Sequence, residues 1–206
     1  MTTTVTKPTR QQIADQIAEE RREIVELCSK LRPEEWNLPS LCEGWEVRDV
    51  VAHVIGVQDG LMKIAMGGGP DRANIRLVKE SRNLPTSTLL SQLVSIIEPS
   101  LMIKLVAMHF LEDTWVHHRD IAWALSAERQ EPANPERVRM LLDGPITKWT
   151  KRYPGLKFVA SDSDWQAGEG LEVKGTGEAI IMGFFHRPAA FERLTGDGLG
   201  RFKNKN

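Results

Sequence analysis

Four polar residues recur within residues 105–125 at the spacing of a single helix face. His109, Asp113, His117 and Asp120 follow one another at intervals of four, four and three residues. An α-helix over this segment would therefore carry all four on one stripe. Imidazole and carboxylate groups are costly to bury unless another group replaces their lost hydration. A metal ion is the most common compensation for the two together, so the spacing predicts a helix that contributes metal ligands.

The composition is that of an ordinary globular chain. Its 206 residues are 41% hydrophobic and 27% charged, with a formal net charge of -1, which suits one medium domain with a small appendage and argues against a nucleic-acid partner. No apolar run approaches the roughly 20 residues that cross a bilayer, and the segment MTTTVTKPTRQQ lacks the apolar core of a signal peptide. With only two cysteines, we expect a cytoplasmic protein without a membrane partner.

Apolar residues recur at helical intervals in several segments of the first 125 residues. These segments, which are separated by proline or glycine, are residues 9–31, 47–65, 87–98 and 100–125. Four such helices, with an uncertain connection between the second and the third, favour a helical bundle, in which metal sites are built from side chains on facing helices.

The pattern changes after Pro132. There follow a helical pattern at residues 135–152, β-branched strand-like runs at 156–161 and 171–175, and a helical pattern at 177–186. We therefore predict a mainly α chain, with a metal-binding four-helix bundle domain over residues 1–150 and a small α+β C-terminal domain over residues 151–206.

A further histidine, His53, lies on the predicted helix at residues 47–65. Taken alone, a histidine on an apolar face is more often a core residue bonded to a carbonyl group, and Asp113 with His117 could form a solvent-facing ion pair. Together the three would supply nitrogen and oxygen ligands from two helices. Three protein ligands leave the open position that is typical of catalytic metal sites. Such ligands suit zinc, and also nickel, iron or manganese.

The neighbouring residues are assigned from their helical positions. Asp120, three residues after His117, is placed to orient an imidazole ring, and His109 could be a fourth or substitute ligand. Glu112 lies about 100° off the stripe, and we expect His118 to point away from the site at the surface.

Other kinds of chemistry have weaker support. The sequence contains no G-x-S-x-G, Walker or dinucleotide-binding glycine motif. Cys42 precedes the His53 helix and could form a cysteine–histidine nucleophile pair with it. A buried structural cysteine is the more common role.

Three segments resemble the mycothiol-dependent maleylpyruvate isomerase family. They are LPSLCEGWEVRDVVAHVIG at residues 38–56, DTWVHHRDIAWAL at 113–125 and the run at 164–199. The first is the most specific, because it couples Gly44-Trp45, Arg48-Asp49 and His53 at fixed offsets. The N-terminal domain of this family belongs to the DinB-like metal-binding four-helix superfamily, so the resemblance implies a DinB-like bundle.

The resemblance implies a divalent metal, usually zinc, held by His53, Asp113 and His117, with mycothiol as the thiol cofactor. In the isomerase, the metal would hold the thiol as a thiolate, which adds to a conjugated double bond before rotation and elimination. The isomerase has Glu where this chain has Asp113. Arg187 is a candidate anchor for a substrate carboxylate. Arg48 is a candidate cofactor contact, although a salt bridge is its simpler role.

These observations predict a metal-dependent enzyme that uses mycothiol or a related low-molecular-weight thiol. The reaction would be isomerisation or S-transfer on a small carboxylated substrate, with Asp120 and Arg187 as candidate catalytic residues, in a monomer or homodimer. Two alternatives stay open at this point. One is a hydrolase whose nucleophile is a metal-bound hydroxide, and the other is a non-enzymatic metal-binding module.

Overall fold

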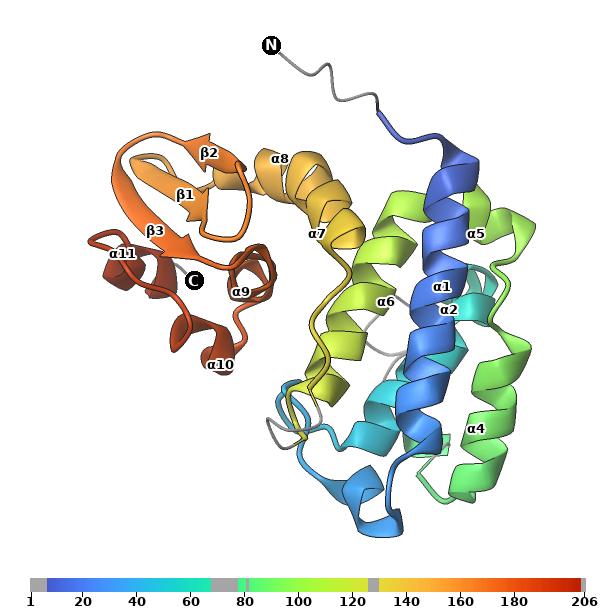
Figure 1. Cartoon of the computed structure of the whole chain (residues 1–206). Coiled ribbons are helices and arrows are strands. Elements are labelled where there is room, and N and C mark those ends of the chain that lie inside the picture. Colours follow the sequence, from blue (N-terminus) through green and yellow to red (C-terminus); the bar gives the residue numbers. More distant parts are fainter. Residues whose placement is uncertain (1–6, 68–77, 81, 126–129, 205–206) are drawn as a thin grey trace. The chain divides into compact units, whose positions relative to one another are not determined.

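The structure of the chain, a computed structural model, describes residues 7–67, 78–80, 82–125 and 130–204 (Figure 1). It divides into two compact units, Met1–Gln130 and Glu131–Asn206. Within the described residues, none of the helices combines the length and apolar character needed to span a membrane.

The first unit is a helical bundle, as predicted. Its longest described helices are α1 (Arg10–Ser29), α2 (Val47–Gly67), α4 (Thr86–Ser95) and α6 (Ala107–Ala122). Helix α1 packs against α4 and α6, and α2 packs against the same two helices (Figure 1). Fully buried aliphatic residues from these helices, including Ile24, Val50, Leu93 and Ile121, form one core cluster, which fixes the rotation of α2 about its own axis.

The predicted helix at residues 100–125 is interrupted. It consists of α5 (Leu101–Leu105) and α6, separated at Val106, whose backbone angles are φ -122° and ψ 32°. Val106 is β-branched and 42% exposed, so it has a weak helix propensity and little burial to compensate. The prediction of one continuous helix was wrong here. The break precedes the polar stripe, so His109, Asp113, His117 and Asp120 all lie on α6.

The second unit combines short helices with a three-stranded sheet. Its elements are α7 (Pro135–Leu141), the π-helical turn η3 (Leu142–Ile146), α8 (Thr147–Thr150), β1 (Leu156–Ala160), β2 (Gln166–Gly168), β3 (Leu171–Gly175), α9 (Gly177–Phe184), α10 (Pro188–Phe191) and α11 (Leu199–Lys203). The strand order is β2-β1-β3, with β1 antiparallel to β2 and parallel to β3. The predicted α+β character of this region is therefore confirmed, although β2 was not anticipated.

The boundary between the units differs from the predicted domain limits of 1–150 and 151–206. Helix α7 packs against α9 and η3, so the helical segment after Pro132 belongs with the sheet. A Cβ atom built on Gly177 of α9 would lie 2.7 Å from Val138 Cγ1 and 2.9 Å from Leu142 Cδ1. This close packing, which periodicity cannot reveal, moves the boundary to Gln130.

Aromatic rings form the core of the second unit. Phe158 of β1 is fully buried, and its ring centroid lies 4.8 Å from that of Phe184 and 4.9 Å from that of Phe202. The ring of Tyr153 packs against the same three rings at 5.1–6.1 Å.

We expect Phe158→Ala to destabilise the second unit by about 3–5 kcal/mol, because it leaves a cavity among aromatic rings. Denaturant unfolding followed by near-ultraviolet circular dichroism measures the loss. Leu171→Ala on β3 is the control, since that side chain is 47% exposed. Equal losses for the two variants would contradict an aromatic core.

Candidate metal centre

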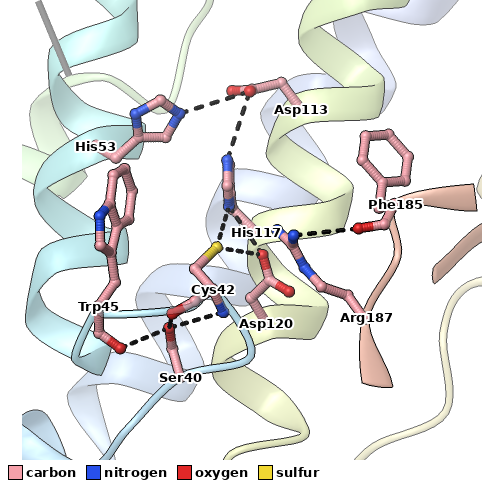
Figure 2. A network of polar contacts seen from close by, with 9 residues as sticks. All are labelled: Ser40, Cys42, Trp45, His53, Asp113, His117, Asp120, Phe185 and Arg187. Atoms are coloured by element: carbon pink, nitrogen blue, oxygen red, sulfur yellow. Dashed lines mark hydrogen bonds and ion pairs between the residues drawn. The ribbon is translucent and has the colours of Figure 1, made fainter. Parts of the chain in front are cut away.

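Helices α2 and α6 bring together the three predicted ligands (Figure 2). His53 Nε2 lies 3.5 Å from Asp113 Oδ1, and His117 Nε2 lies 3.6 Å from the same oxygen. The two imidazole ring centroids are 4.5 Å apart. One ligand atom from each of the three residues lies within 4.8 Å of the others, which is the convergence that one divalent cation needs. Their role as ligands remains a prediction.

Local sequence explains this placement. His53 is flanked on α2 by Val50, Val51 and Val54, all of which are buried. Packing of these valines in the bundle core turns the imidazole of His53 toward α6. On α6 the i, i+4 spacing places the side chain of Asp113 one turn from that of His117.

His53 provides a test of whether the site fits a cation. The residue is only 5% exposed, and neither ring nitrogen makes a hydrogen bond to any residue that the structure describes. An imidazole buried in this way loses its hydration, and the 3.5 Å contact of Nε2 with Asp113 Oδ1 replaces it only in part. The carboxylate of Asp113 and the imidazole of His117 face the same space, so nitrogen and oxygen donors of the kind that bind zinc surround it. The residues present fit a divalent cation.

The charges of the metal-free centre follow from this geometry. Burial by itself raises the pKa of Asp113, but His117 and His53 outweigh it and hold that pKa below its usual value. Burial by itself lowers the pKa of His117, but Asp113, Asp120 and Cys42 outweigh it and hold that pKa well above its usual value. At neutral pH, Asp113 is thus a carboxylate paired with the His117 imidazolium.

The far edge of His117 is held by a second carboxylate. His117 Nδ1 lies 3.0 Å from Oδ2 of Asp120, a fully buried residue, so Asp120 lies where the spacing predicted an orienting group. Cys42 Sγ donates to the same oxygen at 3.0 Å and lies 3.7 Å from His117 Nδ1 (Figure 2). The structure therefore groups Cys42 with His117 and Asp120 rather than pairing it with His53.

An indole ring that the sequence reasoning did not select borders the centre. The ring centroid of Trp45 lies 5.3 Å from that of His53 and 6.4 Å from that of His117, and it is nearly parallel to the latter at 20°. Trp45 follows Gly44, whose φ of +77° makes the turn into α2. The Gly-Trp pair directly before a histidine-bearing helix was the available signal.

The remaining predicted site residues occupy other positions. His109 is exposed and is not among the grouped ligand atoms. Arg48, at the start of α2, donates from Nη2 to the Leu84 carbonyl oxygen at 2.7 Å. Arg187 belongs to the second unit, where its Nη1 donates to the Phe185 carbonyl oxygen at 3.3 Å (Figure 2).

The expectation that His118 lies at the surface was wrong. Its side chain is buried, its Nδ1 contacts the Glu20 carboxylate of α1, and Arg119 Nη2 lies 2.9 Å from the same nitrogen. Helix α6 is covered by α1 as well as by α2, so both of its sides are buried. Glu112 is also buried, and burial raises its pKa to about 7.

Comparisons with known proteins give one family match and two similar folds. Residues 17–101 match the family model described as "Mycothiol maleylpyruvate isomerase N-terminal domain". Two crystal structures are similar in fold to this chain, and the similarity covers 92% of this chain and 93% of each matched chain. One is described as mycothiol-dependent maleylpyruvate isomerase (TM-score 0.68, 19% identity) and the other as a histidine-to-alanine mutant of that enzyme (TM-score 0.63, 18% identity). No curated protein matches the chain.

At such identities the two crystal structures establish the fold, while the family model identifies the segment that contains Cys42, Trp45 and His53. Residues 17–101 of this chain therefore match the N-terminal domain of the mycothiol maleylpyruvate isomerase family.

Proposed function

We propose that this protein is a metal-dependent enzyme that uses mycothiol or a related low-molecular-weight thiol for isomerisation or S-transfer on a small carboxylated substrate. The observation that carries the proposal is the buried imidazole of His53, which has no hydrogen-bond partner among the described residues and faces Asp113 and His117. The family and the descriptions of the two similar crystal structures support mycothiol as the thiol.

His53, Asp113 and His117 would hold the cation, for which zinc is the first candidate and nickel, iron or manganese are compatible. When bound, a divalent cation lowers the pKa of a coordinated thiol and makes it nucleophilic at neutral pH. Asp113 stays ionised, and its Oδ1 is within 3.6 Å of both imidazoles. The side chain of Asp113, shorter than the Glu of the isomerase, is therefore long enough to share a cation with both histidines.

The other residues have supporting roles in this proposal. Asp120 orients His117, and the indole of Trp45 borders the two imidazole rings. The side chain of Asp113 is 34% exposed, which leaves the centre open to a thiol and a substrate. Arg187 stays our candidate anchor for a substrate carboxylate and Arg48 our candidate cofactor contact, since guanidinium groups bind carboxylates in a bidentate manner.

Removal of a ligand tests the proposed site directly. Loss of a residue that only supports a ligand typically weakens metal binding about 10–100-fold. We expect His53→Ala to weaken zinc binding by more than this. Elemental analysis of protein purified without chelator, followed by competition against a chromophoric chelator, measures the loss. His109→Ala is the matched control, because this histidine is exposed on the same helix as Asp113. A full equivalent of metal in His53→Ala would refute the ligand set.

Metal affinity should rise with pH in the neutral range. The pKa of His117 is raised in the fold, so pairing of its imidazolium with Asp113 stabilises the metal-free protein. This stabilisation is fully present at a pH below the ordinary histidine pKa. It is lost as the pH rises through the raised pKa of His117. A cation must displace this proton, so the affinity should increase about tenfold per pH unit until His117 deprotonates.

Calorimetry in buffers of different ionisation enthalpy measures the proton count. We expect release of about one proton per cation at neutral pH. Binding without proton release would contradict the His117–Asp113 pairing.

The proposed use of a thiol cofactor leads to a third prediction. Mycothiol added to the cobalt(II)-loaded protein should produce a near-ultraviolet sulfur-to-metal charge-transfer band. An S-methylated mycothiol, which cannot form a thiolate, is the control ligand. Metal uptake without this band would reject thiol use and favour the metal-dependent hydrolase. Absence of metal in the wild-type protein would reject both enzymes.

A further inference from the structure

A thiol and an imidazole share one buried carboxylate oxygen behind the candidate metal centre. Asp120 Oδ2 lies 3.0 Å from Cys42 Sγ and 3.0 Å from His117 Nδ1 (Figure 2). An ionised carboxylate only accepts hydrogen bonds, so the thiol donates to it through its S–H group and the imidazole through Nδ1–H. Because Asp120 is fully buried, these donors replace the hydration that its charge has lost.

The loop before α2 holds this thiol in a fixed position. The Ser40 hydroxyl accepts from the Cys42 amide at 3.1 Å and donates to the Trp45 carbonyl oxygen at 2.9 Å. The Leu41 amide donates to the Asp120 carbonyl oxygen at 3.3 Å. The loop is thus attached to α6 through the backbone of Asp120 as well as through its side chain.

These contacts select one orientation of the His117 ring. With its Nδ1–H directed at Asp120, the ring presents Nε2 to Asp113, 3.6 Å away. Trp45, from the same loop, lies nearly parallel to this ring. The edge of the ring is therefore held by Asp120, while the indole of Trp45 lies nearly parallel to the ring with the two centroids 6.4 Å apart. A carboxylate that accepts a hydrogen bond from the second ring nitrogen of a ligating histidine fixes the tautomer of the ring and increases its basicity as a ligand.

We propose that Cys42 is a positioning residue of the metal centre, whose thiol holds the Asp120 carboxylate so that His117 presents Nε2 to the cation. The inference rests on the proposed function, since it assigns Cys42 to the support of the same site. It gives the cysteine a role other than nucleophile or core filler.

The hydrogen bond itself is measurable without metal. The infrared S–H stretch of Cys42, assigned by subtraction of the Cys42→Ala spectrum, should lie at the lower frequency of a strongly hydrogen-bonded thiol. Asp120→Asn, which keeps the shape of the side chain, should shift this band and leave the Cys28 band unchanged. A Cys42 band at the position of a weakly bonded thiol, or one insensitive to Asp120→Asn, would overturn the inference.

Metal binding supplies the second readout. We expect Cys42→Ala to weaken zinc binding about 10–100-fold and to alter the cobalt(II) absorption spectrum in the visible region. Cys42→Ser keeps a donor at this position and should restore most of the affinity and the wild-type spectrum.

Cys28→Ala is the matched control. Cys28 lies in the same core cluster and is 2% exposed, so its removal creates a comparable cavity. Unfolding measurements then separate general destabilisation from an effect on the metal. Wild-type affinity and spectrum in Cys42→Ala, or an equal loss in Cys28→Ala, would reject the positioning role. If the wild-type protein itself binds no more metal than His53→Ala, the proposed function fails first, and the inference fails with it.

Discussion

The contact between α2 and α6 is the constraint on which the candidate site depends. It buries the His53 imidazole against the Asp113–His117 pair, and burial of polar groups without partners is costly. The hydrophobic core supplies the opposing free energy, because Val50 and Val51 are fully buried beside His53 on the same helix. Apolar packing therefore holds the His53 imidazole beside the Asp113–His117 pair, an unfavourable arrangement for an imidazole that has lost its hydration. A cation would turn this unfavourable arrangement into a binding site.

Local geometry explains which parts of the site the sequence could predict. The spacing of Asp113, His117 and Asp120 has one consequence in any α-helix, so their common face was predictable without knowledge of the fold. His53 lies beside this face only because its helix packs against α6, and the apolar patterns of the two helices predicted that they pack in a bundle. In contrast, the break at Val106 reflects a weak helix former at an exposed position, and the attachment of α7 to the second unit depends on tertiary packing. Hydrophobic periodicity encodes neither.

Residues outside regular helices were harder to assign. Cys42 and Trp45 lie in a loop whose conformation depends on hydrogen bonds of Ser40 and on the positive φ of Gly44. Sequence spacing therefore does not indicate which atoms they approach. His118 shows the opposite difficulty, because its position away from the site was taken to mean that it lies at the surface. Coverage of α6 by α1 buries His118 beside Glu20, so a polar residue off the site face was not a surface residue.

The two cysteines bear on where a reactive sulfur would come from. Burial raises the pKa of Cys28 to about 12, which keeps this thiol protonated and unreactive. Cys42 donates its S–H to Asp120, an arrangement that requires the protonated thiol. Neither side chain is therefore suited to act as a nucleophile, and thiol chemistry at this centre needs a sulfur from outside the chain. This requirement agrees with the match of residues 17–101 to the mycothiol maleylpyruvate isomerase N-terminal domain, and it follows from the packing of the two thiols independently of that match.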